Sequence, residues 1–269
     1  SREVEKMRAA IHTNIAFGMA AGVLLTVVGM LFTPQILQWM GTPEDVMPQS
    51  VAYIRTYFAG SIGLVMYNQC RGVMQAVGDS RHPLYYLIIS SITNVVLDIL
   101  LIAVFKMDVD GAALATIISQ YISAALVLIC LVRDQGALHL ELGKLRIDSR
   151  VLRRILQVGL PAGFQGTIFS ISNVVIQSAV NGFGSTAIVA GSSASSNIEG
   201  FVYTSMNAFY QTALTFTSQN YGACQCRRVD RIFAMCAAYA AGFGLVLGNL
   251  AYFFGHPLAS IYALSLIHI

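Results

Sequence analysis

The stretch from Pro83 to Phe105, PLYYLIISSITNVVLDILLIAVF, constrains the fold more than any other part of the chain. It is 23 residues long and holds one charged side chain, Asp98. A helix of that length, at about 1.5 Å per residue, measures roughly 34 Å and reaches across the hydrocarbon core of a bilayer. The stretch therefore predicts a membrane-spanning helix with a carboxylate inside it.

The rest of the chain has the composition of a polytopic membrane protein. Hydrophobic residues make up 56% of it and charged residues 11%, with a mean hydropathy of +0.66, whereas a soluble domain is about 25% charged. The net charge is only +3, and the basic residues fall in short clusters between apolar runs. We therefore expect the lipid bilayer as a partner and no nucleic acid. The five cysteines have no metal-ligand spacing.

Turn-forming residues divide the apolar sequence into seven predicted spans, because glycine, proline and aspartate interrupt helices. A short interfacial helix is predicted over 34–40, where the chain has its only tryptophan. The longest polar stretch, 133–154, holds six Lys or Arg residues and is predicted to be a cytoplasmic linker. The predicted spans are 9–32, 51–77, 83–105, 111–132, 155–180, 186–220 and 229–254.

The basic residues also predict the orientation of these spans. Fourteen Lys or Arg residues fall in the opening segment and in alternate connections or the span ends beside them, on the same side of the membrane as Ser1. The connections on the other side hold only Lys106. Since loops rich in Lys and Arg stay in the cytoplasm, the Ser1 side is predicted to be cytoplasmic.

Asn94 stands four residues before Asp98, so both side chains lie on one face of the predicted helix. A carboxylate in the centre of a spanning helix costs about 2.5–3.5 kcal/mol on insertion scales and usually faces the bundle interior. An amide oxygen and a carboxylate can bind one small hard cation or share a proton. We predict an ion-coupling site at this pair. The alternative left open is a buried aspartate that its neighbour satisfies, without a transport role.

The chain also contains a candidate internal repeat. The segment that begins at Arg2 aligns with the segment that begins at Arg227, and Pro34 then falls on Pro257. The two copies lie six predicted spans apart, so both enter the membrane from the same side, as in the parallel repeats of some secondary transporters. Chance similarity between apolar helices is the alternative.

Several motifs together resemble the multidrug and toxic compound extrusion (MATE) transporters, in the bacterial branch that includes the DinF-like proteins. They are MGTPEDV, RGVMQAVGDSRHPLYYLIISSITNVVLD, GAALATIISQ, GLPAGFQ and SQNYGA, and the resemblance covers residues 1–263. It implies an all-α polytopic bundle of twelve helices in two six-helix lobes related as parallel repeats. It also implies alternating access and export of organic, often cationic, compounds driven by Na+ or H+.

The same resemblance carries over an ion-coupling set residue by residue. Asn94 and Asp98 match the NxxxD pattern of the fifth family helix, Thr116 matches a threonine on the sixth, and Asn68 an asparagine on the fourth. Na+ would then bind at Asp98, Asn94 and Thr116. Helix rise also predicts that Asp98 and Thr116 lie about 8–10 Å below the outer surface.

A substrate cavity is predicted in the second half of the chain. Its candidate residues are Glu199, Tyr203, Met206 and Gln165. Three roles are open for Glu199: it attracts cationic substrates, caps a bend at Gly200, or pairs with helices that this chain lacks. The aromatic and thioether side chains either line a cavity suited to planar cations or serve as ordinary helix packing.

On this interpretation residues 1–132 are the remainder of a first lobe, family helices three to six. Residues 133–154 are the cytoplasmic linker, and residues 155–263 hold family helices seven to nine. The ending 264–269, LSLIHI, is predicted to be a non-native tail, with a natural terminus as the alternative.

The motifs that are missing narrow the function class. The sequence has no GxxxxGK[ST] phosphate loop and no HExxH or GxSxG motif, so we expect neither an ATP-driven pump nor an enzyme, and no cofactor. The leading hypothesis is a cation-coupled exporter of drugs or toxins, with a small-molecule substrate, in the bacterial plasma membrane and monomeric at full length. The alternative within the superfamily is a flippase for lipid-linked oligosaccharide or peptidoglycan precursors, which needs a basic cavity. A membrane scaffold without transport is the third hypothesis.

Overall fold

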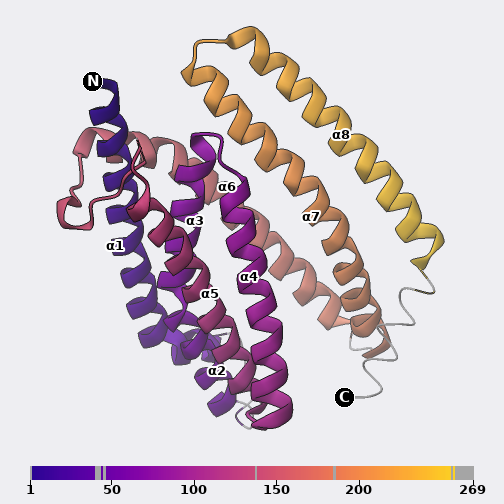
Figure 1. The fold of residues 1–269 in the computed structure, drawn as a ribbon. Helices are drawn as coiled ribbons and strands as arrows, with labels where there is room; N and C mark the ends of the chain where they lie inside the picture. The colour runs from indigo at the N-terminus through magenta and orange to yellow at the C-terminus, as the bar shows by residue number, and fades with distance from the viewer. Residues whose placement is uncertain are drawn as a thin grey trace. The chain divides into compact units, whose positions relative to one another are not determined.

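The computed structural model describes residues 2–39, 44, 47–136, 138–183, 186–255 and 257. In this part of the chain the regular structure is entirely helical, and a helix lies over each of the seven predicted spans, which confirms the all-α class (Figure 1). The predicted tail 264–269 lies outside the described residues. The elements are α1 (Arg2–Trp39), α2 (Met47–Ala59), α3 (Ser61–Ala76), α4 (Arg81–Asp98), the π-helix η1 (Ile99–Val104), α5 (Asp108–Arg133), the 3₁₀-helix η2 (Leu142–Lys144), α6 (Ser149–Gly182), α7 (Thr186–Gly222) and α8 (Cys226–Phe253).

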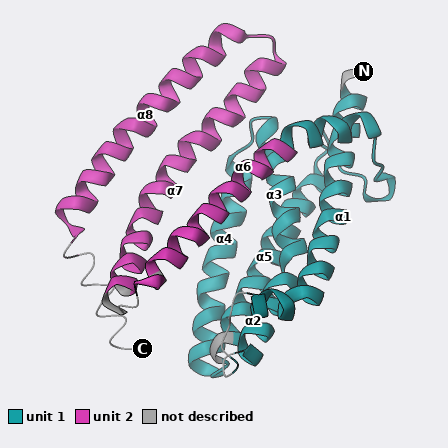
Figure 2. Ribbon diagram, turned by 180° about the vertical axis from the view of Figure 1, so that it is seen from behind, with its two compact units in different colours: residues 1–159 teal, residues 160–269 magenta. Residues whose placement is uncertain are grey.

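Four of the described helical segments are long and apolar enough to cross a membrane. Helices α6 and α7 have 34 and 37 residues and are more polar, and α2 and α3 are each short. The chain divides into two compact units, residues 1–159 and 160–269 (Figure 2). The spanning segments are Val4–Trp39, Arg81–Val104, Asp110–Arg133 and Cys226–Phe253.

The core of the first unit lies where α1, α3 and α5 pack against one another. Cys70 of α3 and Val127 of α5 are fully buried there, as is Ile15 of α1. Small residues let the backbones approach: a Cβ added to Gly63 would lie 3.2 Å from the backbone nitrogen of Tyr121. Close approach of this kind stabilises helix pairs in lipid, where the hydrophobic effect contributes little.

The single helix predicted over 51–77 is broken at Gly60 into α2 and α3. Neighbouring helices supply hydrogen bonds to the carbonyls before the break. The hydroxyl of Thr26 in α1 donates to the Phe58 carbonyl at 3.0 Å, and the hydroxyl of Tyr121 in α5 donates to the Ala59 carbonyl at 2.7 Å. A helix can break at membrane depth only where such partners replace the lost backbone bonds.

The first helix continues to Trp39 instead of ending before a separate interfacial helix. Pro34 lies inside α1 and has no N–H to donate to the carbonyl four residues earlier. Arg55 of α2 donates to that carbonyl, the oxygen of Met30, from Nε at 3.1 Å. The side chain of Arg55 therefore supports the helix at its proline, a role the sequence did not suggest.

The polar stretch 133–154 is packed against the first unit. Leu140 is buried in the same core, and its N–H donates to the Leu131 carbonyl at 3.0 Å. The buried hydroxyl of Thr13 in α1 donates to the Arg146 carbonyl at 3.3 Å and accepts the Asp148 N–H at 3.0 Å. This segment is therefore part of the folded unit, whereas its role as an inter-lobe linker stays a prediction.

A charged cluster lies on the same segment. The Lys144 ammonium lies 2.6 Å from a Glu141 carboxylate oxygen, and this hydrogen bond lowers the pKa of the Glu141 carboxyl. The backbone N–H of Glu141 donates to Nε2 of His12 at 3.3 Å. This hydrogen bond links the segment to α1.

In the second unit α7 and α8 pack side by side along their lengths (Figure 1). The Phe209 ring of α7 lies between two rings of α8, with centroids 6.2 Å from Tyr239 and 5.2 Å from Phe243. Met206 lies over Gly244, whose added Cβ would be 3.2 Å from the Met206 sulfur. These contacts fix the register of the two helices.

Candidate ion-coupling and substrate sites

Helix α4 has two distinct faces. On one face Ile92, Val95 and Ile99 are each more than half exposed, as expected of side chains that contact lipid. The half-buried Asn94 and Asp98 lie on the other face, and α4 packs extensively against α5. The carboxylate of Asp98 therefore lies on the packed side of the helix, as intramembrane acids usually do.

Both polar residues have an atom without a partner. Oδ1 of Asp98 and Nδ2 of Asn94 are buried and have no hydrogen-bond partner in the described part of the chain. An unsatisfied buried polar group costs about 1–3 kcal/mol, and more when it is charged. A half-turn of the Asn94 amide exchanges its nitrogen and oxygen. The pair can then present two oxygens to a cation. Alternatively, a protonated Asp98 carboxyl can donate a hydrogen bond to the Asn94 oxygen.

Two contacts on either side of this pair set the register between α4 and α5. Ser90 of α4 donates from Oγ to the backbone carbonyl of Ser119 in α5. Further along, a Cβ added to Gly111 would lie 3.2 Å from the Leu101 Cβ. Because the helices are antiparallel, this register puts Thr116 level with Asn94, one turn from Asp98.

The Thr116 hydroxyl is oriented to accept rather than to donate at the site. It donates its hydrogen to the Ala112 carbonyl of its own helix at 2.9 Å. Its oxygen lone pairs therefore stay available to a cation. The three predicted ligands Asp98, Asn94 and Thr116 lie within about a turn of one another on two packed helices. That they bind an ion stays a prediction.

The backbone changes at the predicted site as well. Asp98 is the last residue of α4, and the π-helix Ile99–Val104 begins directly after it. Its wider turn is shown by the Phe105 N–H, which donates to the Leu100 carbonyl at 3.0 Å, five residues back. Turns of this kind are rare and occur frequently at functional sites.

Asn68 is placed differently from the other three residues. It is exposed on α3, and its amide donates to the Leu64 carbonyl at 2.8 Å. The neighbouring Tyr67 donates from its hydroxyl to the Pro83 carbonyl at the beginning of α4, and Asp98 lies roughly 22 Å further along that helix. The structure therefore does not bring Asn68 together with Asp98, and its role stays a prediction.

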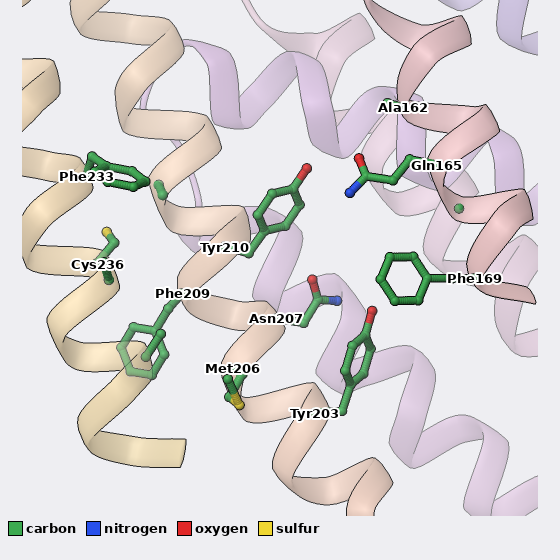
Figure 3. A pocket seen from close by; sticks show the side chains of 14 residues that line it. Ala162, Gln165, Phe169, Tyr203, Met206, Asn207, Phe209, Tyr210, Phe233 and Cys236 are labelled. Carbon is green, nitrogen blue, oxygen red and sulfur yellow. The ribbon is translucent and has the colours of Figure 1, made fainter. Parts of the chain in front are cut away.

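A cavity of about 540 Å³ lies in the second unit. Figure 3 shows Tyr203, Asn207 and Tyr210 of α7 on one side, with Gln165 and Phe169 of α6 facing them. The volume is in the range of small-molecule sites, which combine apolar walls with a few polar groups. Three of the predicted cavity residues line it: Gln165, Tyr203 and Met206.

Glu199 does not line this cavity. It lines a separate groove between α7 and α8 together with Ser195 and Gly248. Met206 packs over Gly244 of α8. Along α8, Gly244 lies between Ala240, which lines the cavity, and Gly248, which lines the groove. The structure therefore separates Glu199 from the other three predicted residues.

Asn207 is a cavity residue that the sequence analysis missed. It follows Tyr203 by four residues and lies on the same helix face, where Figure 3 shows its amide between the two tyrosines. Helical spacing from Tyr203 could have identified it. Phe169 was not predicted either, and it supplies an aromatic wall of the same cavity.

Comparison with known proteins decides the family. A family model described as MatE matches residues 1–100 and 161–265, more than half of the chain. The chain belongs to the MatE family. This confirms the resemblance predicted from the motifs.

Bacterial MatE relatives share the sequence at moderate identity. The probable multidrug resistance protein YoeA of Bacillus subtilis is 28% identical over 97% of this chain and 58% of its own length. The FAD transporter of Shewanella oneidensis is 25% identical over 89% of this chain and 54% of its own length. The chain thus spans about half the length of the curated relatives it matches.

Solved MatE structures share the fold. An outward-facing multidrug resistance MATE transporter of the MOP superfamily has a TM-score of 0.84 at 21% identity, covering 95% of this chain and 56% of the other. A MOP superfamily transporter from Pyrococcus furiosus has a TM-score of 0.83 at 18% identity, covering 96% and 63%. The chain is therefore a multi-pass membrane protein with part of the MatE fold.

Proposed function

We propose that the protein containing this chain is a secondary active transporter that exports organic, often cationic, compounds in exchange for Na+ or H+. The observation that carries the proposal is the half-buried Asp98–Asn94 pair on the packed face of α4, with one buried and unpartnered atom on each side chain. A buried charge without a partner is unfavourable unless an ion or a proton neutralises it. The pair is thus suited to bind and release a cation.

The chemistry at Asp98 couples two states of the transporter. With Na+ or H+ bound the carboxylate is neutralised, and without it the charge favours an arrangement that admits water. A bound cation therefore shifts the balance between two conformations by its differential affinity for them. Because such coupling is reciprocal, the substrate must shift the ion affinity in turn.

The cavity of the second unit suits flat organic substrates. The rings of Tyr203, Tyr210 and Phe169 offer aromatic faces, and Gln165 and Asn207 offer amide groups. Aromatic faces attract organic cations without a fixed negative charge. Multidrug resistance or multidrug export is named for several relatives of this chain, and these names support the same substrate class.

The flippase alternative is not favoured by the same cavity. A pyrophosphate-linked substrate needs arginine or lysine to bind its phosphates. The described residues that line the cavity include neither. The bacterial plasma membrane, a cytoplasmic Ser1 side and a monomeric state belong to the proposal, and the charge asymmetry of the loops supports the orientation.

The proposal is tested by Asp98→Asn in the full-length protein, reconstituted in vesicles with an imposed Na+ or proton gradient. We expect gradient-driven export of a fluorescent organic cation to be lost while the amount of inserted protein is unchanged. Asp110→Asn is the matched control, because Asp110 is an exposed aspartate at the start of α5. Export by Asp98→Asn at the wild-type rate would overturn the proposal.

A further inference from the structure

Ser90 lies on the same face of α4 as the ion-coupling pair. It precedes Asn94 by four residues and Asp98 by eight, so the three side chains stack on successive turns. Ser90 is 6% exposed, and its Oγ donates to the backbone carbonyl of Ser119 in α5. The adjacent Ser91 is exposed.

The acceptor of this hydrogen bond is itself connected to the site. The Ser119 hydroxyl, also buried, donates to the Thr116 carbonyl at 2.7 Å. A link of two hydrogen bonds at Ser119, one accepted by its carbonyl and one donated by its hydroxyl, therefore connects Ser90 with the backbone of Thr116. It crosses from the helix that holds the carboxylate to the helix that holds the hydroxyl ligand.

We propose that Ser90 is a positioning residue for ion coupling, which holds α4 in the register that brings Asn94 level with Thr116. The inference rests on the proposed role of Asp98. Ser90 has no direct contact with the ion in this scheme. It acts through the distance between the oxygen ligands of two helices, because a binding site needs its ligands held within about 0.5 Å of the productive geometry.

This role predicts a particular pattern of effects. Without the Ser90 hydroxyl, α4 and α5 can slide or rotate slightly, and the ion ligands separate. The substrate cavity described above is lined by α6, α7 and α8 only. Ion affinity should therefore change while the affinity for the exported compound stays the same.

The experiment compares Ser90→Ala, Ser90→Thr and Ser91→Ala in the reconstituted full-length protein. We expect Ser90→Ala to raise the ion concentration for half-maximal export by about threefold or more, in line with one interhelical hydrogen bond in a membrane. The substrate KM and the maximal rate, both measured at saturating ion, should stay at wild-type values. Ser90→Thr keeps the hydroxyl and should restore the ion dependence, and Ser91→Ala should not change it.

The outcomes separate this inference from the proposed function. If Ser90→Ala lowers the rate equally at all ion concentrations, or lowers only the amount of folded protein, Ser90 is merely structural and the inference fails. When transport is too weak to measure, ion binding to the purified protein, normalised to its folded fraction, tests the same change in ion affinity. If Asp98→Asn leaves the ion dependence unchanged, the proposed function fails instead.

Discussion

Gly63→Ala should loosen the contact between α3 and α5. The added Cβ would lie 3.2 Å from the Tyr121 backbone nitrogen and 3.3 Å from the Gln120 carbonyl carbon. Both atoms belong to the backbone of α5, so no side chain can rotate away, and the helices must separate by a few tenths of an ångström. Overpacking of this kind costs about 1–3 kcal/mol.

A matched control removes the effect of helix propensity. Replacing glycine with alanine inside a helix contributes about 1 kcal/mol of stability by itself. Gly72 lies in the same helix, and a Cβ added there meets nothing within 4 Å. The difference between Gly63→Ala and Gly72→Ala therefore isolates the clash, and we expect it to be about 1–3 kcal/mol in favour of Gly72→Ala.

Thermal unfolding of the full-length protein in detergent measures this difference. Each kcal/mol corresponds to roughly 2–4 °C for a domain of 150–250 residues, so the two variants should unfold several degrees apart. If Gly63→Ala unfolds at the temperature of Gly72→Ala or above it, the described contact between α3 and α5 does not limit the stability of the first unit.

Two further predictions concern the segment that packs against α1. Thr13→Val removes a buried hydroxyl that bonds Arg146 and Asp148, at a cost of about 1–3 kcal/mol; limited proteolysis should cut within 138–148 faster, and Thr93→Val, whose hydroxyl bonds only its own helix, should not change the rate. The second prediction concerns pH. The Lys144 hydrogen bond lowers the pKa of the Glu141 carboxyl. The ionised Glu141 therefore stabilises the folded state above its unfolded pKa, about 4.3, and this stabilisation is lost as the pH falls through the folded pKa. The gap in unfolding temperature between wild type and Glu141→Gln should therefore close below about pH 4; a gap that widens there would contradict this.

Some of the structure could be predicted from the sequence because it depends on local pattern. The spacing of Asn94 and Asp98 determines that they share a helix face, and an acid in an apolar run must turn away from lipid. Both features are present in α4. Described helices cover all seven predicted ranges, although the range 51–77 is divided between α2 and α3.

The break at Gly60 could not be predicted in this way. A glycine in a membrane helix usually serves close packing. Whether the helix also breaks depends on Thr26 and Tyr121, which supply hydrogen bonds from helices distant in the sequence. The continuous path of α1 through Pro34 likewise depends on a donor from elsewhere, Arg55.

The location of Glu199 shows a different limit. Its spacing from Tyr203 and Met206 predicts a shared helix face, and the structure nevertheless separates it from their cavity. The separation depends on Met206 filling the space over Gly244 of the partner helix. Helical periodicity specifies a face but not what the neighbouring helix places opposite each turn.

The most direct test of the central claim is coupling-ion binding to the purified full-length protein in the absence of substrate. Bound Na+, or protons taken up by the purified protein when the pH is lowered, should be measurable in the wild type and in Asp110→Asn. We predict that Asp98→Asn abolishes this signal and that Asn94→Ala weakens it. Ion binding by Asp98→Asn equal to that of the wild type would contradict the account.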